Sequence, residues 1–456
     1  MALNLSLFVI REILEKQLVD CCDLLEDLRI HQISTDTRSL KPGDLFLALR
    51  GENFDGHRFI PQAVAQGAVA IMGEEKVTLA DPGVPQLVVS DSLQAYQQIA
   101  HGWRKQLTLP VIGVTGSVGK TTTKELMAAV LSLSGKVHKT AANYNNEIGV
   151  PKTLLEITPD HDYAIIEMAM RGPGEIALLA EIAEPTIGVI TNVGTAHIGR
   201  LGSEEAIAAA KCELLAAMPQ TSQAVLNADN ELLMATAAKV WSGQCVNYGL
   251  ERGDIQGQIL KGDILQVGKM RFPLPLAGRH NASNYLAALA VAQILGLDWQ
   301  PLTQGLTVNL PGGRARRYAV SNDILLLDET YNAGLESMLA ALQLLKETPG
   351  KRRIAVLGAM KELGERSPEF HRRVGERAGQ LGLDYLFVLG NDPEAISIAE
   401  GAQNLSWQIS PTPEDLVQHL QHFLKKGDRV LFKASNSIGL GQVVEGVRQG
   451  LTENES

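Results

Sequence analysis

The sequence has little cysteine. Four cysteines occur among 456 residues, at Cys21, Cys22, Cys212 and Cys245. They form neither a Cys-x-x-Cys pair nor the ligand spacing of a structural zinc site. This pattern argues against a disulfide framework and fits a reducing compartment, so we expect a cytoplasmic protein.

Long hydrophobic runs and an excess of positive charge are missing as well. No stretch approaches the roughly 18 apolar residues of a membrane span. The apolar segment 3–10 lacks a basic leader and runs into charged residues, which predicts a surface helix and not a signal peptide. The net charge is −10, whereas binding to nucleic acid needs a basic face. We therefore expect no membrane span and no nucleic-acid partner.

What the sequence has is the composition of a soluble enzyme with several domains. Hydrophobic residues make up 45% and charged residues 20%, and there are 43 glycines. The chain exceeds one ordinary core, since a domain has roughly 100–200 residues. Breaks at Leu109-Pro110 and near Leu310-Pro311-Gly312-Gly313 predict three domains, over residues 1–108, 109–310 and 311–456.

Short apolar runs recur along the chain and alternate with helical segments. This alternation predicts an α/β fold with mainly parallel sheets that are covered on both faces. Several runs end in polar residues, which would meet at the edge of a sheet where ligands bind. The expected strands are 111–114, 164–166, 187–190, 224–226, 324–327, 354–357, 386–389 and 430–432.

A phosphate-binding loop follows the first of these strands. It reads Thr-Gly-Ser-Val-Gly-Lys-Thr-Thr and precedes a helical segment, 124–130. The glycines let backbone N–H groups surround phosphates, Lys120 can neutralise the β/γ oxygens, and Thr121 can offer its hydroxyl to Mg²⁺. Position 114 is Val, where the strict Walker spacing requires Gly. The predicted ATP-binding residues here are Thr115, Gly116, Ser117, Val118, Gly119, Lys120, Thr121 and Thr122.

Three further residues are candidates by position. Glu167 follows an apolar strand beside this loop and suits an Mg²⁺ ligand. His197 lies in a glycine-containing loop, where it could reach a second metal or could equally have no role. Lys211 lies in a helix expected over 203–215, where composition alone favours a solvated lysine.

A segment of amides and basic side chains at 278–284 precedes an Ala/Leu-rich helix. As a loop it could read an adenine or a ribose, or Asn281 or Ser283 could simply cap the helix. Arg314 and Asp328 open the third block.

These motifs together resemble the Mur ligase family and, within it, the MurF type, over essentially the whole chain. The absence of the Asn-Pro-Arg motif of the MurE type favours MurF. Segments 34–38, 42–46 and 55–57 resemble the family's UDP-sugar-binding domain, segments 115–122, 143–146 and 278–281 with Glu167 its ATPase domain, and segments 328–333 and 357–364 its C-terminal Rossmann-like domain.

The resemblance implies an ATP-dependent ligase that joins a carboxylate to an amine through an acyl phosphate. The substrates would be a UDP-N-acetylmuramoyl tripeptide and D-alanyl-D-alanine, which give the pentapeptide precursor of peptidoglycan. Two Mg²⁺ ions would assist. We expect a monomer.

The resemblance also implies roles for single residues. Lys120, His197 and Lys211 would be catalytic. Thr121 and Glu167 would hold one Mg²⁺, and His197 and Lys211 would serve the second, with Lys211 as a carbamate formed with CO₂. ATP would also contact Asn281, Arg314 and Asp328, and the other substrates would contact Thr37, Arg38, Asn143, Asn145 and Asn332.

Three departures from the family's pattern lie in the third domain. Gly334-Leu335 replaces a frequent Asn-Pro, Ala359 replaces Asp, and Asn436 replaces the Arg of a Lys-Gly-Ser-Arg segment. These departures put the contacts to the amine substrate in question more than those to ATP.

Other functions stay open at this point. Folylpolyglutamate synthase is a related ligase, but its loop carries Gly-Lys-Gly-Ser where this chain has Gly-Lys-Thr-Thr. A P-loop kinase would need no amine. An ATP-gated regulatory protein would hydrolyse ATP slowly and would need no third domain for a second substrate.

Overall fold

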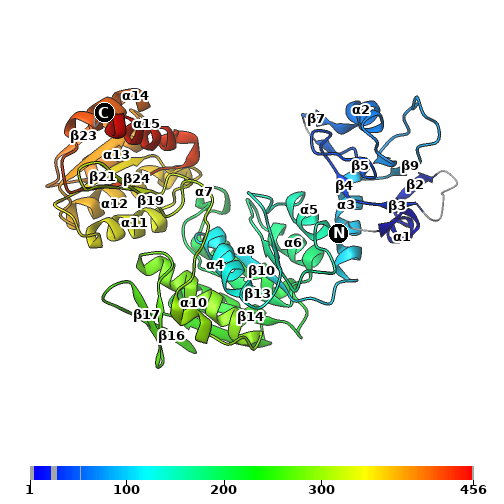
Figure 1. Cartoon of the computed structure of the whole chain (residues 1–456), viewed down its shortest axis with the longest axis horizontal. Helices are drawn as coiled ribbons and strands as arrows, with labels where there is room; N and C mark the ends of the chain where they lie inside the picture. Colours follow the sequence, from blue (N-terminus) through cyan, green and yellow to red (C-terminus); the bar gives the residue numbers. More distant parts are fainter. Residues whose placement is uncertain (1–4, 22–27, 52, 454–456) are drawn as a thin grey trace.

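The computed structural model describes residues 5–21, 28–51 and 53–453, and most of its strands form three large sheets. Five strands belong to the N-terminal sheet, nine to the central sheet and six to the C-terminal sheet. Figure 1 shows the N-terminal and C-terminal bodies on opposite sides of the central one. This arrangement confirms the α/β class with three domains, while the limits 1–108, 109–310 and 311–456 remain our proposal.

The N-terminal sheet has the order β2-β9-β8-β5-β4, with β2 antiparallel to β9 and the other pairs parallel. The helix expected within 3–10 is α1, which the hydroxyl of Ser6 caps; residues 3 and 4 lie outside the described ranges. The elements are β1 (Leu5–Ser6), α1 (Leu7–Ile13), β2 (Leu18–Cys21), β3 (Arg29–Ile30), β4 (Ile33–Ser34), β5 (Leu45–Leu47), β6 (Arg50–Gly51), β7 (Phe54–Asp55), η1 (Gly56–Phe59), α2 (Ile60–Ala65), β8 (Ala70–Gly73), β9 (Gln86–Val89) and α3 (Ser92–Arg104).

The central sheet has the order β11-β12-β10-β13-β14-β15-β16-β17-β18. Its pairs are parallel up to β16, and β16, β17 and β18 pair antiparallel. The elements are β10 (Val111–Thr115), α4 (Lys120–Leu131), β11 (Val137–Lys139), α5 (Gly149–Leu155), β12 (Tyr163–Glu167), α6 (Glu175–Ala183), β13 (Ile187–Ile190), α7 (Ile198–Leu201), α8 (Glu204–Ala217), β14 (Gln223–Asn227), α9 (Glu231–Val240), β15 (Gln244–Gly249), β16 (Ile255–Leu260), β17 (Ile264–Val267), β18 (Met270–Pro273), α10 (Arg279–Ile294) and η2 (Gln300–Gln304).

The apolar runs of the central strands are continuous because both faces of the sheet are covered. In β12, Ala164 and Ile166 belong to one core cluster and Ile165 to another. Successive side chains of a strand point to opposite faces, so a strand between two helical layers needs apolar residues at every position. The helices α5, α6 and α8 contribute to the first core, and α4 and α10 to the second.

The C-terminal sheet has the order β19-β20-β24-β21-β22-β23, in which only the β19–β20 pair is antiparallel. All eight strands expected from the sequence are present in the central and C-terminal sheets. The elements are β19 (Arg316–Val320), β20 (Ile324–Asp328), α11 (Leu335–Glu347), β21 (Arg352–Gly358), η3 (Gly364–Arg366), α12 (Ser367–Gln380), β22 (Tyr385–Leu389), α13 (Pro393–Gly401), β23 (Trp407–Ser410), α14 (Pro413–Phe423), β24 (Asp428–Lys433), η4 (Asn436–Ile438) and α15 (Leu440–Glu453).

Helix α3 attaches the N-terminal body to the central one. It packs against α5 and α6. The indole Nε1 of Trp103 donates to the carbonyl of Ile157 at 3.0 Å. Arg104 is 7% exposed, and its guanidinium donates to the carbonyls of Ala183, Glu184 and Leu107 at 2.9, 3.0 and 2.9 Å.

Within the part of the chain that the structure describes, no helix combines the length and the apolarity that crossing a membrane would need.

We predict that Arg104→Met destabilises the protein by on the order of 3 kcal/mol, because buried carbonyls lose their charged donor. The neighbouring Lys105 is exposed, so Lys105→Met is the matched control and should keep the wild-type value. The midpoint of urea unfolding measures both. Equal midpoints for the two variants would contradict the attachment assigned to Arg104.

Candidate active site

A cavity of about 970 Å³ lies between the central and C-terminal bodies. Thirteen of the residues predicted from the sequence line it: Ser117, Val118, Gly119, Lys120, Thr121, Thr122, Asn143, Asn145, Glu167, His197, Asn281, Arg314 and Asn332. Thr37, Arg38, Thr115, Gly116, Lys211 and Asp328 are not part of this lining. Side chains from two bodies therefore converge on one space.

The phosphate loop has a backbone shape that depends on glycine. Gly116 has φ +147°, and a Cβ there would lie 2.0 Å from Oγ1 of Thr191. Gly119 has φ +85° and precedes the first turn of α4. Both positive φ values are strained for residues with a side chain. The loop therefore brings its N–H groups and the N-terminus of α4 to the cavity, as an anion site requires.

Asn192, from the loop after β13, clamps the phosphate loop. Its Oδ1 accepts from the N–H of Val118 at 3.0 Å, and its Nδ2 donates to the carbonyl of Val118 at 3.0 Å. The carbonyl of Asn192 accepts from the N–H of Ser117 at 3.0 Å. Asn192 is one of the polar residues that follow the expected strands, and its clamping role becomes visible only in the structure.

Lys120 lies folded back on its own loop. Its Nζ donates to the carbonyl of Gly116 at 2.7 Å and lies 3.4 Å from that of Ser117. Burial lowers the pKa of Lys120, and Glu167 opposes that shift. The ammonium thus has weak neutral acceptors that an anion in the cavity can replace.

Glu167 at the end of β12 is 2% exposed. Its Oε1 accepts from Oγ1 of Thr121 at 3.2 Å and from Nδ2 of Asn145 at 2.8 Å. Its Oε2 has no hydrogen-bond partner among the described residues and lies 3.6 Å from Nζ of Lys124. A buried carboxylate oxygen with spare acceptor capacity beside a hydroxyl suits a divalent cation.

Lys124 is a part of the site that the sequence did not reveal. It is 1% exposed, donates to the carbonyl of Thr140 at 2.7 Å and lies 3.3 Å from Glu125, which also pairs with Lys139. The hydroxyl of Thr140 accepts from the backbone N–H of Glu167 at 2.9 Å. A lysine in a predicted helix is usually solvated, so only the three-dimensional structure places it beneath Glu167.

His197 is the N-cap of α7, and Lys211 lies within the next helix, α8. Nδ1 of His197 is 2.6 Å from Oε2 of Glu362, a close contact that is poorly aligned for a hydrogen bond. Lys211 is 0% exposed, and its Nζ lacks a hydrogen-bond partner in the described structure. Burial lowers the pKa of Lys211 well below its usual value, and Lys120 lowers it further. The solvated lysine favoured by composition is therefore wrong.

The segment 278–284 is helical and not a loop, which corrects our expectation. Helix α10 begins at Arg279 with Gly278 as its N-cap, so Asn281 and Ser283 lie inside the helix and do not cap it. Asn281 donates to the carbonyl of Ala277 at 2.8 Å. The first turns of α10 still line the cavity, because Asn281, Ser283 and Asn284 face it.

Arg314 and Asp328 differ in their environment. The guanidinium of Arg314 stacks on the ring of Tyr331, 3.8 Å from its centroid, and both residues line the cavity. Asp328 is 6% exposed and accepts from the N–H and the hydroxyl of Thr330 at 3.1 and 2.7 Å. In this structure Asp328 supports the loop that follows β20.

Thr37 and Arg38 lie in the N-terminal body. Arg38 pairs with Asp36 at 2.7 Å and is 88% exposed. Arg38 lowers the pKa of Asp36, and Lys152 of the central body lowers it a little further. Asp36 in turn raises the pKa of Arg38, with a smaller contribution from Tyr144. Thr37 and Arg38 belong to the segment that the resemblance assigns to substrate binding.

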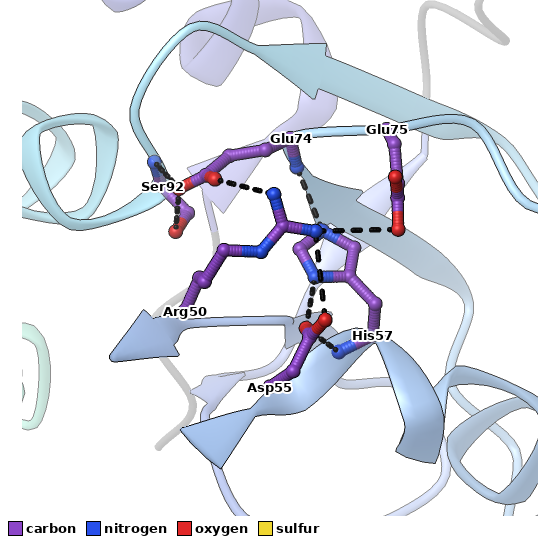
Figure 2. Close-up of polar contacts among 6 residues, drawn as sticks. All are labelled: Arg50, Asp55, His57, Glu74, Glu75 and Ser92. Atoms are coloured by element: carbon purple, nitrogen blue, oxygen red, sulfur yellow. Dashed lines mark hydrogen bonds and ion pairs between the residues drawn. The ribbon is translucent and has the colours of Figure 1, made fainter. Parts of the chain in front are cut away.

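A polar cluster in the N-terminal body has a structural role. Figure 2 shows His57 between Asp55 and Glu74, with Arg50 directed at Asp55, Glu74 and Glu75. Asp55, His57 and Glu75 could together offer ligands to a metal. However, Nδ1 of His57 contacts Asp55 at 2.7 Å and Nε2 accepts from the N–H of Glu74 at 2.8 Å. Both ring nitrogens are engaged, and Arg50 already supplies the cation.

The three departures are accommodated differently. Gly334 is the N-cap of α11, and the hydroxyl of Ser337 bonds both its N–H and its carbonyl. Leu335 is 2% exposed in the core. Ala359 is buried, and its carbonyl accepts from the N–H of Ser435 at 3.1 Å. Asn436 lines the cavity.

Comparison with known proteins places the site in a family. The chain matches the Mur ligase middle domain over residues 114–292, the Mur ligase glutamate ligase domain over 313–436, and the catalytic domain of the Mur ligase family over 29–104. It is 63% identical to the UDP-N-acetylmuramoyl-tripeptide–D-alanyl-D-alanine ligase of a Synechocystis species, over 99% of this chain and 98% of that one. The chain belongs to the Mur ligase family.

Other Mur ligases agree over nearly the full length. The enzyme of the same name from Escherichia coli is 37% identical, over 93% of this chain and 95% of that one. The crystal structure of MurF from Acinetobacter baumannii matches with a TM-score of 0.87 and 30% identity, over 98% and 99% of the two chains. MurF from Thermotoga maritima in complex with ADP matches with a TM-score of 0.83 and 32% identity, over 93% and 98%.

The site of this Mur ligase has a titratable side chain whose effect on stability can be measured. Burial, and then Lys433, lowers the pKa of His280 from 6.5 to about 4. Because the unfolded chain then takes up this proton at higher pH than the folded one, His280 stabilises the fold above its unfolded pKa, and this contribution is lost as pH falls towards 4. We predict that His280→Gln loses less stability than the wild type between about pH 7.5 and about pH 5.

Urea midpoints at the two pH values provide the measurement. His422 is exposed, so His422→Gln serves as the control and should follow the wild type. The same pH dependence in His280→Gln as in the wild type would show that His280 titrates normally.

Proposed function

We propose that this chain joins the carboxylate of a UDP-N-acetylmuramoyl tripeptide to the amine of D-alanyl-D-alanine at the expense of ATP. The observation that carries the proposal is the shared cavity. The phosphate loop, the central-body residues Asn143 and Asn145, and the C-terminal residues around Asn332 line the same space. A nucleotide, a carboxylate and an amine can therefore meet there. A P-loop kinase or an ATP-gated regulator is set aside, since the chain is a Mur ligase.

The reaction has two steps. The carboxylate oxygen attacks the γ-phosphorus, and the bond from this phosphorus to the oxygen that bridges to the β-phosphate breaks. The products of this step are an acyl phosphate and ADP. The amine nitrogen then attacks the acyl carbon, loses a proton, and inorganic phosphate departs as the amide forms. Lys120 moves from the carbonyl of Gly116 to the phosphoryl oxygens, and the N–H groups of the phosphate loop bind the β-phosphate.

The residues present fit two Mg²⁺ ions. Thr121 and Glu167 would hold one, since Oε2 of Glu167 has acceptor capacity to spare among the described residues. His197 and Lys211 would serve the other. When bound, such ions neutralise charge on the transferring phosphoryl group. The protein's own groups orient the phosphates and the carboxylate and exclude water.

Lys211 would enter this scheme as a carbamate. Its burial disfavours the ammonium form, and only a neutral amine reacts with CO₂. The nitrogen forms a bond to the carbon of CO₂ and releases a proton, which converts a cation site into an anion. Lys211 is 0% exposed, and its Nζ has no hydrogen-bond partner among the described residues. As a carbamate it would be an anion with Mg²⁺ as its partner, whereas an ammonium there would be a buried charge without one.

We further propose that ATP contacts Asn281, Arg314 and Asp328, and that Thr37 and Arg38 bind the UDP part. We also propose a cytoplasmic monomer. Cys212 and Cys245 are free thiols, which is compatible with a reducing compartment.

We predict that the enzyme forms ADP with the UDP-tripeptide and D-alanyl-D-alanine at least about 100-fold faster than with D-alanine alone. A site for a dipeptide leaves buried polar groups without partners when the second residue is missing. Coupled measurement of ADP formation with each amine tests this. Equal rates with D-alanine, L-lysine or diaminopimelate would remove the dipeptide specificity and leave the ligase chemistry intact.

For Lys211 we predict that the substitution Lys211→Ala lowers kcat by about 100-fold or more, and that short carboxylates restore part of it. The mass of the intact wild-type protein at saturating bicarbonate should include one CO₂, which the variant lacks. An unmodified wild-type mass, or full activity of the variant, would contradict the carbamate.

A further inference from the structure

The loop between β13 and α7, residues 191–197, touches the phosphate loop and the C-terminal body at once. On its inner side, Oγ of Ser117 accepts from the N–H of Gly194 at 3.0 Å and lies 3.4 Å from the carbonyl of Gly194. Thr191 donates to the carbonyl of Val118 at 2.7 Å. The conformation of this loop therefore determines where the phosphate loop lies.

On its outer side, the same loop receives a carboxylate from the C-terminal body. Oε1 of Glu336 accepts from the backbone N–H of Thr195 at 2.8 Å, and Oε2 lies 3.3 Å from the hydroxyl of Thr195. One carboxylate thus holds both donors of one residue, which fixes the orientation as well as the distance. Glu336 also lines the cavity.

The contact requires a glycine. A Cβ at Gly194 would lie 2.6 Å from Cδ of Glu336 and 2.7 Å from its Oε1. Any side chain at 194 would push the carboxylate off Thr195. The two bodies are therefore complementary in shape at this point, and not only in hydrogen bonding.

Helix α11 presents Glu336 in its first turn. The hydroxyl of Ser337 accepts from the N–H of Gly334 at 3.1 Å and donates to the carbonyl of Gly334 at 2.9 Å, and Leu335 is buried. These contacts keep the start of the helix in place, although the chain has Gly334-Leu335 where the family often has Asn-Pro. A carboxylate in the first turn is also favoured by the helix dipole.

A second contact holds the other end of the segment. The carbonyl of Glu362, from the C-terminal body, accepts from the N–H of Gly199 at 3.2 Å. A Cβ on Gly199 would lie 2.5 Å from the backbone nitrogen of Gly364. The segment 194–199 is thus gripped by the C-terminal body at both ends.

We infer that Glu336 is a positioning residue that transmits the docking of the C-terminal body to the phosphate loop, through Thr195, Gly194 and Ser117. The inference rests on the proposed function and adds to it a physical link between the domain that brings the amine and the loop that binds ATP. Because such a link is reciprocal, nucleotide in the cavity also favours the docked position of the C-terminal body.

The test compares Glu336→Ala, Glu336→Gln and Gly194→Ala in the full chain. We expect Glu336→Ala to lower kcat by about tenfold, to weaken ADP binding in calorimetry, and to speed hydrogen exchange at the amides of Gly194 and Thr195 by about tenfold. Gly194→Ala should reproduce these effects, since its Cβ displaces the carboxylate. Glu336→Gln should recover part of kcat, because its amide oxygen still accepts from Thr195.

Two comparisons separate positioning from loss of structure. Glu347 lies exposed at the far end of the same helix, so Glu347→Ala should match the wild type in all three measurements. The effects of Glu336→Ala and Ser117→Ala on kcat should be less than additive, because both break one chain of contacts. Fully additive effects, or wild-type amide exchange in Glu336→Ala, would overturn the inference.

Failure of the proposed function would look different. The wild type would then form no ADP with the UDP-tripeptide and D-alanyl-D-alanine. Amide exchange and ADP binding do not depend on turnover, so comparing them between Glu336→Ala and the wild type would still test the link between Glu336 and the phosphate loop.

Discussion

The clamp between the loop after β13 and the phosphate loop is the constraint on which the site depends. Asn192 engages both backbone groups of Val118, and a Cβ on Gly116 would collide with Thr191. The anion-binding N–H groups are thereby oriented before a ligand arrives, so little conformational entropy is lost on binding. Strands β12, β13 and β14 contribute to this arrangement by placing Glu167, Thr191 and Asn227 at the same edge.

Buried charges around Glu167 are balanced by opposite charges. Lys124, Glu125, Lys139 and Glu167 form a connected set of opposite charges. A buried charge without a partner is costly, and removing one member of a pair is strongly destabilising. Lys211 lies outside this set, and its Nζ has no hydrogen-bond partner within the described ranges. Its chemistry therefore differs from that of Lys124, although both are buried lysines in helices.

Much of the fold could be predicted because its signals are local. The eight apolar strands, the phosphate loop and its helix follow from patterns within a few residues. Strands β15 to β18 were missed because they are polar and pair in part as antiparallel hairpins. The start of α10 was placed too late, since its first turns carry amides that are typical of loops. The roles of Lys124, Asn192 and Glu336 depend on partners that are distant in sequence, so no local pattern contains them. Glu167 is 43 residues from Lys124, Val118 is 74 from Asn192, and Thr195 is 141 from Glu336.

The packing of α3 also limits how this architecture can be modified. The helix ends the N-terminal segment, yet Trp103 and Arg104 bind carbonyls of the central body. One hydrophobic core also contains Ile99 of α3 and Leu179 of α6. A cut between the first two domains would expose this apolar face and strand several buried carbonyls. Chimeras that exchange the precursor-binding domain between related ligases should therefore carry the facing surfaces of α5 and α6 along with α3. The two sides of this interface pack as one unit, so they must be exchanged together.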